Sequence, residues 1–182
     1  RLSRTINRSL TAQCNYLAEV AEQYKYGRNN GLKYRVIRRA AHNNDAEVAS
    51  LISTLATEPD FDPTQKSLAF EFLCLNHTLL SYIAALGAHR EKIEDQEVLT
   101  LLDLAVENIQ GSLLKDEVPD LNAQNMLDTI RQRLSSNNKD DQKALIVLQQ
   151  LSLMLSILNQ LSRLKQSLSH DRDDKATELA SL

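Results

Sequence analysis

Apolar residues recur every three or four positions through most of the chain, which is the spacing of one face of an α-helix. In the first segment this stripe runs from Ile6 to Tyr24 and ends at a turn that begins with Gly27. The same spacing returns in later segments, and polar breaks separate them; the firmest break contains Pro59 and Pro63. The pattern therefore predicts a series of helices. They cover residues 2–27, 32–57, 64–90, 95–115, 120–135 and 141–168.

The predicted helices differ in how much apolar surface they carry. Residues 64–90 form the most hydrophobic segment of the first half and are expected to be the central helix. Residues 141–168 place leucines close to a heptad repeat, but the repeat is shorter than four heptads, which favours bundle core over a free coiled coil. Residues 169–182 are polar and acidic and predict a frayed tail. The predicted fold is all-α, an antiparallel helical bundle of about six helices in one soluble domain over residues 1–168.

Composition agrees with a soluble helical domain. Apolar residues make up 42% and charged residues 25% of the chain, and only four Gly and three Pro are present for turns. Two apolar windows, Leu68–Leu86 and Leu145–Leu164, approach the length of a membrane span, but polar residues interrupt both, and neither is predicted to cross a bilayer. The two cysteines, Cys14 and Cys74, are too few for a disulfide framework, so we expect buried thiols. Because the chain begins with Arg1 and lacks an apolar leader, we expect a piece of a longer protein.

Charge is distributed unevenly along the chain. Residues 1–42 carry nine Lys/Arg and two acids, whereas the other 140 residues carry 12 Lys/Arg and 22 acids. The formal net charge of −3 therefore combines a basic front end with an acidic body. Such an asymmetry indicates contact with an anionic surface or partner.

The sharpest basic cluster lies in the second predicted helix. Arg35, Arg38, Arg39 and His42 follow i, i+3, i+4, i+7 spacing and therefore share one face. This face can simply be solvated, or its arginines can pair with acids elsewhere in the bundle. The functional alternative is contact with phosphate or carboxylate, above all with anionic lipid head groups. Nucleic acid is disfavoured because no zinc-finger or helix-turn-helix spacing occurs and the acidic body would repel a polyanion.

Catalytic and metal-binding patterns are sparse. The histidines lie far apart, and no Gly-rich phosphate loop, nucleophile elbow or His-Glu-x-x-His sequence occurs. Cys74 and His77 are one helical turn apart, but the sequence nominates no further ligands, which favours ordinary packing over a metal site. The tyrosines near the first turn could edge a pocket, although helix packing is the commoner role. The tyrosines in question are Tyr16, Tyr24, Tyr26 and Tyr34. We therefore predict no enzyme activity, no cofactor and no metal.

Four strings stand out in the first 90 residues: YLAE at 16–19, RRAAHNNDA at 38–46, FLCLNHTLLSYI at 72–83 and ALGAHR at 85–90. They resemble the YccS/YhfK family of bacterial inner-membrane proteins, which belongs to the fusaric acid resistance, or aromatic acid exporter, superfamily. The resemblance is strong over residues 1–90, while residues 91–182 match in helical character and position. It implies the soluble cytoplasmic region that follows the last membrane helices of a longer protein. A basic segment just after a membrane helix agrees with the positive-inside rule.

These observations lead to three functional hypotheses. The first is a non-catalytic accessory or regulatory domain of an exporter of aromatic or other organic acids, on the cytoplasmic side of the inner membrane and oriented by its basic helix face against anionic lipid. The second is an assembly module of a homo-oligomeric membrane protein, and the third is a small-molecule sensor with a carboxylate near Arg38 or Arg39. The resemblance supplies the substrate class and assigns no substrate-binding residue to this segment.

Overall fold

The computed structural model describes residues 1–117, 121–136 and 142–181, apart from the side chains of 121–123 and 170–179. Over these ranges the chain forms six α-helices and no strand, which confirms the all-α prediction. The helices are α1 (Leu2–Tyr26), α2 (Leu32–Leu55), α3 (Pro63–Ala88), α4 (Gln96–Leu114), α5 (Leu121–Ser135) and α6 (Gln142–Ala180).

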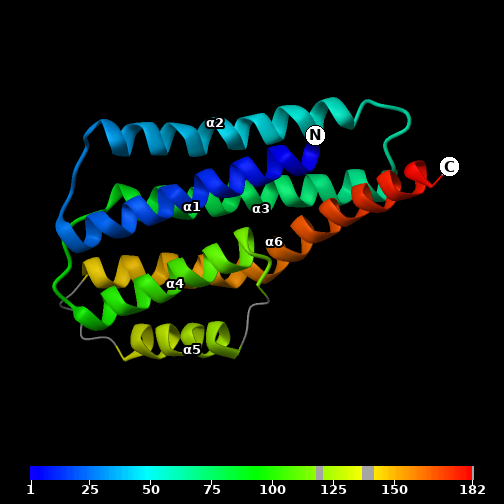
Figure 1. The fold of residues 1–182 in the computed structure, drawn as a ribbon. Helices are drawn as coiled ribbons and strands as arrows, with labels where there is room; N and C mark the ends of the chain where they lie inside the picture. Colours follow the sequence, from blue (N-terminus) through cyan, green and yellow to red (C-terminus); the bar gives the residue numbers. More distant parts are fainter. Residues whose placement is uncertain (118–120, 137–141, 182) are drawn as a thin grey trace.

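Four helices, α1, α3, α4 and α6, form the centre of the molecule, and two helices cover it from outside (Figure 1). Helix α1 packs against α4, and α3 packs against α6. Helix α2 lies on the α1–α3 side, and α5 lies on the α4–α6 side. Consecutive helices run in opposite directions in this view. The core fills the space between the two sides with aliphatic side chains and with the large buried rings of Tyr16, Tyr24 and Phe72.

Local sequence signals fix several helix ends. The Asp62 carboxylate accepts a hydrogen bond from the Thr64 amide at 3.0 Å, and Pro63 occupies the first helical position, where its missing N–H has no cost. Asp95 caps α4 by accepting from the amides of Glu97 and Val98. Gly27 ends α1 with φ of 111°, a left-handed conformation that residues with a side chain rarely adopt.

The largest difference from the predicted elements is in α6. The sequence predicts a helix ending at residue 168 and a frayed tail, but α6 continues to Ala180. Residues 169–180 are polar and show no apolar stripe, so the spacing does not predict a helix there. A helix already formed over the 27 residues 142–168 can nevertheless continue through them, because adding a residue to an existing helix costs less than starting one. The sequence also favours Pro119 in a first helical turn and Asp140 as a cap; both residues, like Leu182, lie outside the described ones.

Helices α3 and α6 each contain a long apolar segment. By length and composition alone, Pro63–Ala88 and Gln142–Ser169 are each long and apolar enough to cross a membrane. In the structure both helices belong to the packed centre and contact each other, and core helices commonly pass the same test. The sequence expectation that neither crosses a bilayer stays a prediction.

Two buried groups in the centre have chemical consequences. Cys14 is buried, and burial raises the pKa of its thiol to about 12, although the charge of Lys165 opposes this. Lys165 itself is buried and donates hydrogen bonds to the Leu113 carbonyl at 2.5 Å and to Asp116 at 3.1 Å, so it satisfies the C-terminal end of α4. Cys74 is exposed, so the prediction of two buried thiols is wrong for this residue. It lies on the solvent side of α3, beside the apolar stripe.

Candidate functional site

The basic face predicted on α2 is accessible. Arg35, Arg38 and Arg39 are exposed, and His42 is half-buried. Among the described residues, no acidic side chain forms an ion pair with any of these three arginines. The alternative in which acids of the bundle neutralise them is therefore disfavoured. Three guanidinium groups remain able to contact an external anion.

The buried face of α2 is turned about the helix axis relative to the predicted face. The spacing predicts Ile37, Ala41, Asn44 and Val48 as the buried stripe; Ala41 and Val48 are buried, but Ile37 and Asn44 are only half-buried. As a result, Arg38 and His42 border the core instead of lying opposite it. The full set of buried residues in α2 is Tyr34, Ala41, Asp45, Val48, Leu51 and Ile52.

Tyr16 of α1 lies next to His42 and Arg38, at the edge of the core. Its ring centroid lies 6.2 Å from that of His42. Burial raises the pKa of the Tyr16 phenol, and the nearby Arg38 guanidinium opposes that rise. Burial also lowers the pKa of His42, and the Arg38 charge lowers it further. These effects favour the neutral imidazole, although the charge of Asp45 opposes them, so the positive charge of this face comes mainly from the arginines.

A buried polar network joins α1, α2 and α3 beneath the basic face. Asn76 lies at its centre: its side-chain carbonyl accepts from Gln13 at 2.7 Å, and its amide donates to Ser9 at 3.0 Å and to Asp45 at 3.0 Å. The second oxygen of Asp45 lies 2.8 Å from Nδ1 of His77. Ser9, Gln13 and Asn76 are fully buried. Apolar spacing alone does not predict this network; its signal in the sequence is the polar residues within the apolar stripes.

The i, i+3 pair Cys74 and His77 has an ordinary environment. His77 is 68% exposed and its ring contacts Asp45, while Cys74 is exposed on the same helix. Within the described residues, no group of three or more His, Cys, Asp or Glu side chains is arranged to hold a metal ion.

Tyrosines and one buried arginine fix the turn between α1 and α2. Arg90 is 3% exposed, and its guanidinium lies 3.7 Å from the centroid of the Tyr34 ring, a cation–π contact. It donates hydrogen bonds to the side chain of Gln23 at 2.5 Å, to the Gly87 carbonyl at 2.5 Å and to the side chain of Asn30. Its partners are neutral oxygens, so Arg90 ties the end of α3 to the turn and offers no chemistry of its own.

The tyrosine cluster predicted around the first turn divides into two kinds. Tyr16, Tyr24 and Tyr34 are buried and pack between helices; the Tyr24 hydroxyl donates to the Leu86 carbonyl at 2.6 Å. Tyr26 is 78% exposed. The packing role therefore applies to three of the four.

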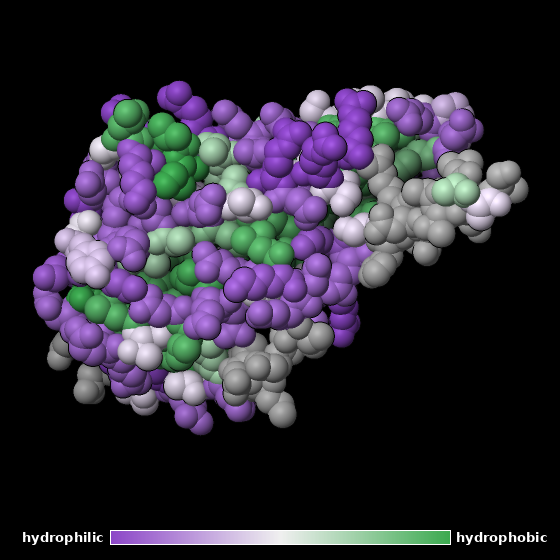
Figure 2. Space-filling model, viewed as in Figure 1, coloured by the Kyte–Doolittle hydropathy of each residue, from purple (hydrophilic) through white to green (hydrophobic). Residues whose placement is uncertain are grey.

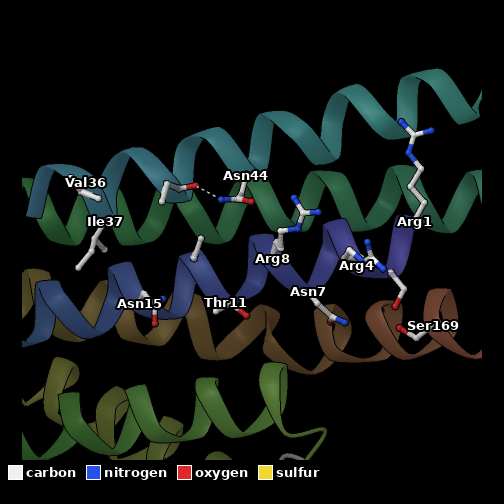
Figure 3. Close-up of a pocket in the computed structure, with 13 residues that line it drawn as sticks. Arg1, Arg4, Asn7, Arg8, Thr11, Asn15, Val36, Ile37, Asn44 and Ser169 are labelled. Atoms are coloured by element: carbon white, nitrogen blue, oxygen red, sulfur yellow. Dashed lines mark hydrogen bonds between the residues drawn. The ribbon is translucent and has the colours of Figure 1, made fainter. Parts of the chain in front are cut away.

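A groove of about 780 Å³ lies along α1 and α2, with Ser169 of α6 at its edge (Figure 3). In Figure 3, Val36 and Ile37 lie at one end, and Arg1 and Arg4 lie toward the other. Arg8 also lines it and contacts Glu47 at a distance of 3.9 Å. Because Arg8 lies opposite Glu47, the basic start of α1 faces the second half of α2 and is separate from the α2 arginines. The complete lining is Arg1, Ser3, Arg4, Asn7, Arg8, Thr11, Ala12, Asn15, Val36, Ile37, Ala40, Asn44 and Ser169.

Comparison with known proteins gives two relatives. The chain is 40% identical over 92% of its length to "Inner membrane protein YccS" of Escherichia coli, and it spans 24% of that protein. It is 34% identical over 52% of its length to an uncharacterised protein of Haemophilus influenzae, of which it spans 13%. No family model and no solved structure matches the chain. The first similarity extends well beyond the 90 residues over which the sequence strings were strongest.

Proposed function

The chain belongs to the YccS family, and on that premise we propose that it is a non-catalytic accessory or regulatory domain on the cytoplasmic side of a bacterial inner-membrane protein. By the family resemblance, the membrane protein exports aromatic or other organic acids. The domain's task is to hold a defined orientation against the anionic leaflet. The domain is tethered, so weak contacts act at high effective concentration.

The observation that carries this proposal is the exposed arginine face of α2. Arg35, Arg38 and Arg39 lack acidic partners among the described residues, and the relative with the longer match is an inner-membrane protein. Each Lys or Arg near an anionic bilayer contributes about 1 kcal/mol. Three arginines therefore suffice to orient a tethered domain, but only weakly recruit a free one.

Co-sedimentation with phosphatidylglycerol-containing vesicles tests the proposal. The Arg35→Glu/Arg38→Glu/Arg39→Glu variant is expected to lose binding at low salt. The matched control, Lys115→Glu/Arg131→Glu/Arg163→Glu, makes the same change in net charge at exposed positions outside α2 and is expected to retain most of the binding. Equal binding by the wild type and the α2 variant would overturn the role of this face.

A sensor function is the second candidate, and the α1–α2 groove favours it. Its volume of about 780 Å³ is that of a small-molecule site, and it combines guanidinium groups with Val36 and Ile37. On this candidate the carboxylate would lie near Arg4 and Arg8, which line the groove, whereas the sequence hypothesis has it near Arg38 or Arg39. Calorimetric titration with aromatic carboxylates tests it, with Arg4→Gln/Arg8→Gln as the variant expected to lose the heat of binding.

An assembly function is the third candidate. Leu104 and Leu114 of α4 and Leu153 of α6 are exposed by 43%, 39% and 40%, and such leucines can contribute to a contact between copies. Sedimentation equilibrium tests for self-association. A mass equal to one chain at high concentration would argue against a stable oligomer of the domain, and a dimer or trimer would favour this candidate.

A further inference from the structure

The turn between α1 and α2 exposes apolar side chains that the bundle does not use. Tyr26, Leu32 and Val36 are 78%, 69% and 56% exposed, the highest values among the large hydrophobic residues described. Figure 2 shows hydrophobic residues gathered over the start of α2, within a largely hydrophilic surface. Residues 26–39, which contain all three, are called the hairpin tip. Single exposed apolar residues are common, but a group in one short segment calls for an explanation.

The apolar residues of the tip share one side of α2. Leu32 and Val36 are one helical turn apart, and at 100° per residue they lie opposite the buried Ala41 and Val48. Arg35 adjoins them on the same exposed side. The start of α2 therefore has two apolar faces, one in the core and one directed at solvent, and the second is bordered by cations.

Charge identifies the kind of surface that this face fits. The hairpin tip contains five Lys/Arg and no Asp or Glu. Lys33 forms an ion pair with Glu19 at 3.2 Å, whereas Arg28, Arg35 and Arg39 have no ion pair with the described residues. Exposed apolar and aromatic side chains beside cations, without acids, match the interface of an anionic bilayer, where rings and aliphatic groups enter the head-group region and cations contact phosphates.

The tip is held in place before any contact is made. Arg90 donates to Asn30, and the Asn29 amide donates to the Gln23 side chain at 2.9 Å, so the middle of the turn is fixed to α1 and to the segment that follows α3. The Ile93 amide also donates to the Tyr24 carbonyl at 2.8 Å, next to the end of α1. A preorganised tip loses little conformational freedom on binding.

We propose that the hairpin tip enters the interfacial layer of an anionic bilayer, with Tyr26, Leu32 and Val36 inserted and Arg28, Arg35 and Arg39 on lipid phosphates. This deepens the proposed function and rests on it: the arginine face gives orientation by charge, and the tip adds a point of insertion. The domain would then meet the membrane at this end of the α1–α2 hairpin.

Tryptophan fluorescence provides a site-specific test, because the chain contains no Trp. Leu32→Trp reports from the tip. Phe70→Trp, at a residue 42% exposed near the start of α3, is the matched control at the other end of the bundle. With vesicles of phosphatidylglycerol and phosphatidylethanolamine, the emission of Leu32→Trp is expected to shift to the blue and to be quenched by lipids brominated in the acyl chain. Phe70→Trp is expected to show neither change. Bound protein with no quenching of Leu32→Trp would overturn the insertion.

A second pair of variants separates insertion from charge. Leu32→Ser/Val36→Ser is expected to bind these vesicles about tenfold more weakly than the wild type, with the difference persisting at high salt. Arg35→Gln/Arg39→Gln is expected to lose about fivefold per arginine at low salt only. If the serine variant binds like the wild type while the glutamine variant fails, insertion is wrong and the proposed function stands. If the wild type does not bind even at low salt and high lipid concentration, where weak contacts are still detected, both are overturned. Circular dichroism confirms that each variant is folded.

Discussion

Asn76 is the single residue on which the packing of α1, α2 and α3 depends most. It is fully buried and bonds Gln13, Ser9 and Asp45, which lie on two other helices. In a low-dielectric interior a satisfied network of this kind specifies one register of the helices, and a partly satisfied one is costly. The sequence shows Asn76 as an interruption in an apolar helix, but it cannot show which distant polar groups meet it. Those partners are 31 to 67 positions away in the chain.

Removing the amide of Asn76 tests this dependence. Asn76→Ala removes the side-chain partner of Gln13, Ser9 and Asp45, although Gln13 keeps its bond to the main-chain carbonyl of residue 76, and the free energy of unfolding is expected to fall by about 2–4 kcal/mol. His77→Ala is the neighbouring control. It removes a contact to a ring that is 68% exposed and is expected to cost about 0–1 kcal/mol. Urea denaturation measures both; equal losses would show that the network is not the stabilising element.

The two cysteines give a second prediction at this scale. Burial raises the pKa of Cys14 to about 12, so its thiolate is scarce at pH 8 and the thiol is inaccessible, while Cys74 is exposed. A disulfide reagent is expected to label one thiol per native chain quickly and the second only after denaturation. Cys74→Ser is expected to abolish the fast reaction. Two fast thiols in the native wild type would contradict the packing of α1 in the core.

At the scale of elements, apolar spacing predicts where helices lie better than how they face. The break that contains Pro59 and Pro63 predicts a helix from residue 64, and α3 begins one residue earlier, at Pro63, because Asp62 caps it and these effects are local. The rotation of α2 does not follow from spacing, because Asp45 is buried by partners on other helices and the periodic pattern treats it as a surface residue. The candidate arginines could be predicted because their spacing is local to one helix. The groove and the exposed tip could not, because they depend on how α1 and α2 face each other.

Asp95 connects two elements, since it caps α4 and also contacts Arg133 of α5 at 2.6 Å. Burial raises the pKa of Asp95. The amide of Val98, the Arg133 guanidinium and the amide of Glu97 together lower it by more than burial raises it, so the pKa of Asp95 lies below its ordinary value. A carboxylate with a depressed folded-state pKa stabilises the fold above its unfolded-state pKa of about 3.9, and this contribution is lost as the pH falls through the folded-state pKa.

Asp95→Asn keeps the cap and removes the charge. The variant is expected to be about 0.5–1 kcal/mol less stable at pH 7. Its stability is also expected to fall less than that of the wild type between about pH 5 and pH 2, because it lacks the carboxylate whose protonation weakens the contact with Arg133. Asp62→Asn, which alters the cap of α3, is the control. Parallel pH profiles for wild type and Asp95→Asn would exclude a role for the ion pair. Thermal unfolding across this pH range measures the effect.

At the scale of the whole molecule, the two outer helices are attached very differently. Helix α2 has 24 residues, packs on α1 and α3, and shares their buried polar network. Helix α5 has 15 residues and, among the described elements, packs only on α4 and α6. Its described buried side chains are Met126, Leu127 and Ile130. Few buried contacts and short length place α5 at the low end of local stability, while the proposed membrane-facing helix α2 belongs to the more firmly held half.

Hydrogen exchange followed by mass spectrometry checks this gradient. Amides of α5 are expected to exchange at least about tenfold faster than those of α3, because α5 can open without disturbing the α1–α2–α3 network. Ile130→Ala, which removes a fully buried side chain from α5, is expected to speed exchange there and to leave α1–α3 nearly unchanged. Val48→Ala in α2 is the counterpart and is expected to raise exchange throughout α1–α3, since that half opens as a unit. Uniform protection of all helices, or a global response to Ile130→Ala, would mean that the bundle unfolds as one cooperative body and that α5 is as firmly bound as α2.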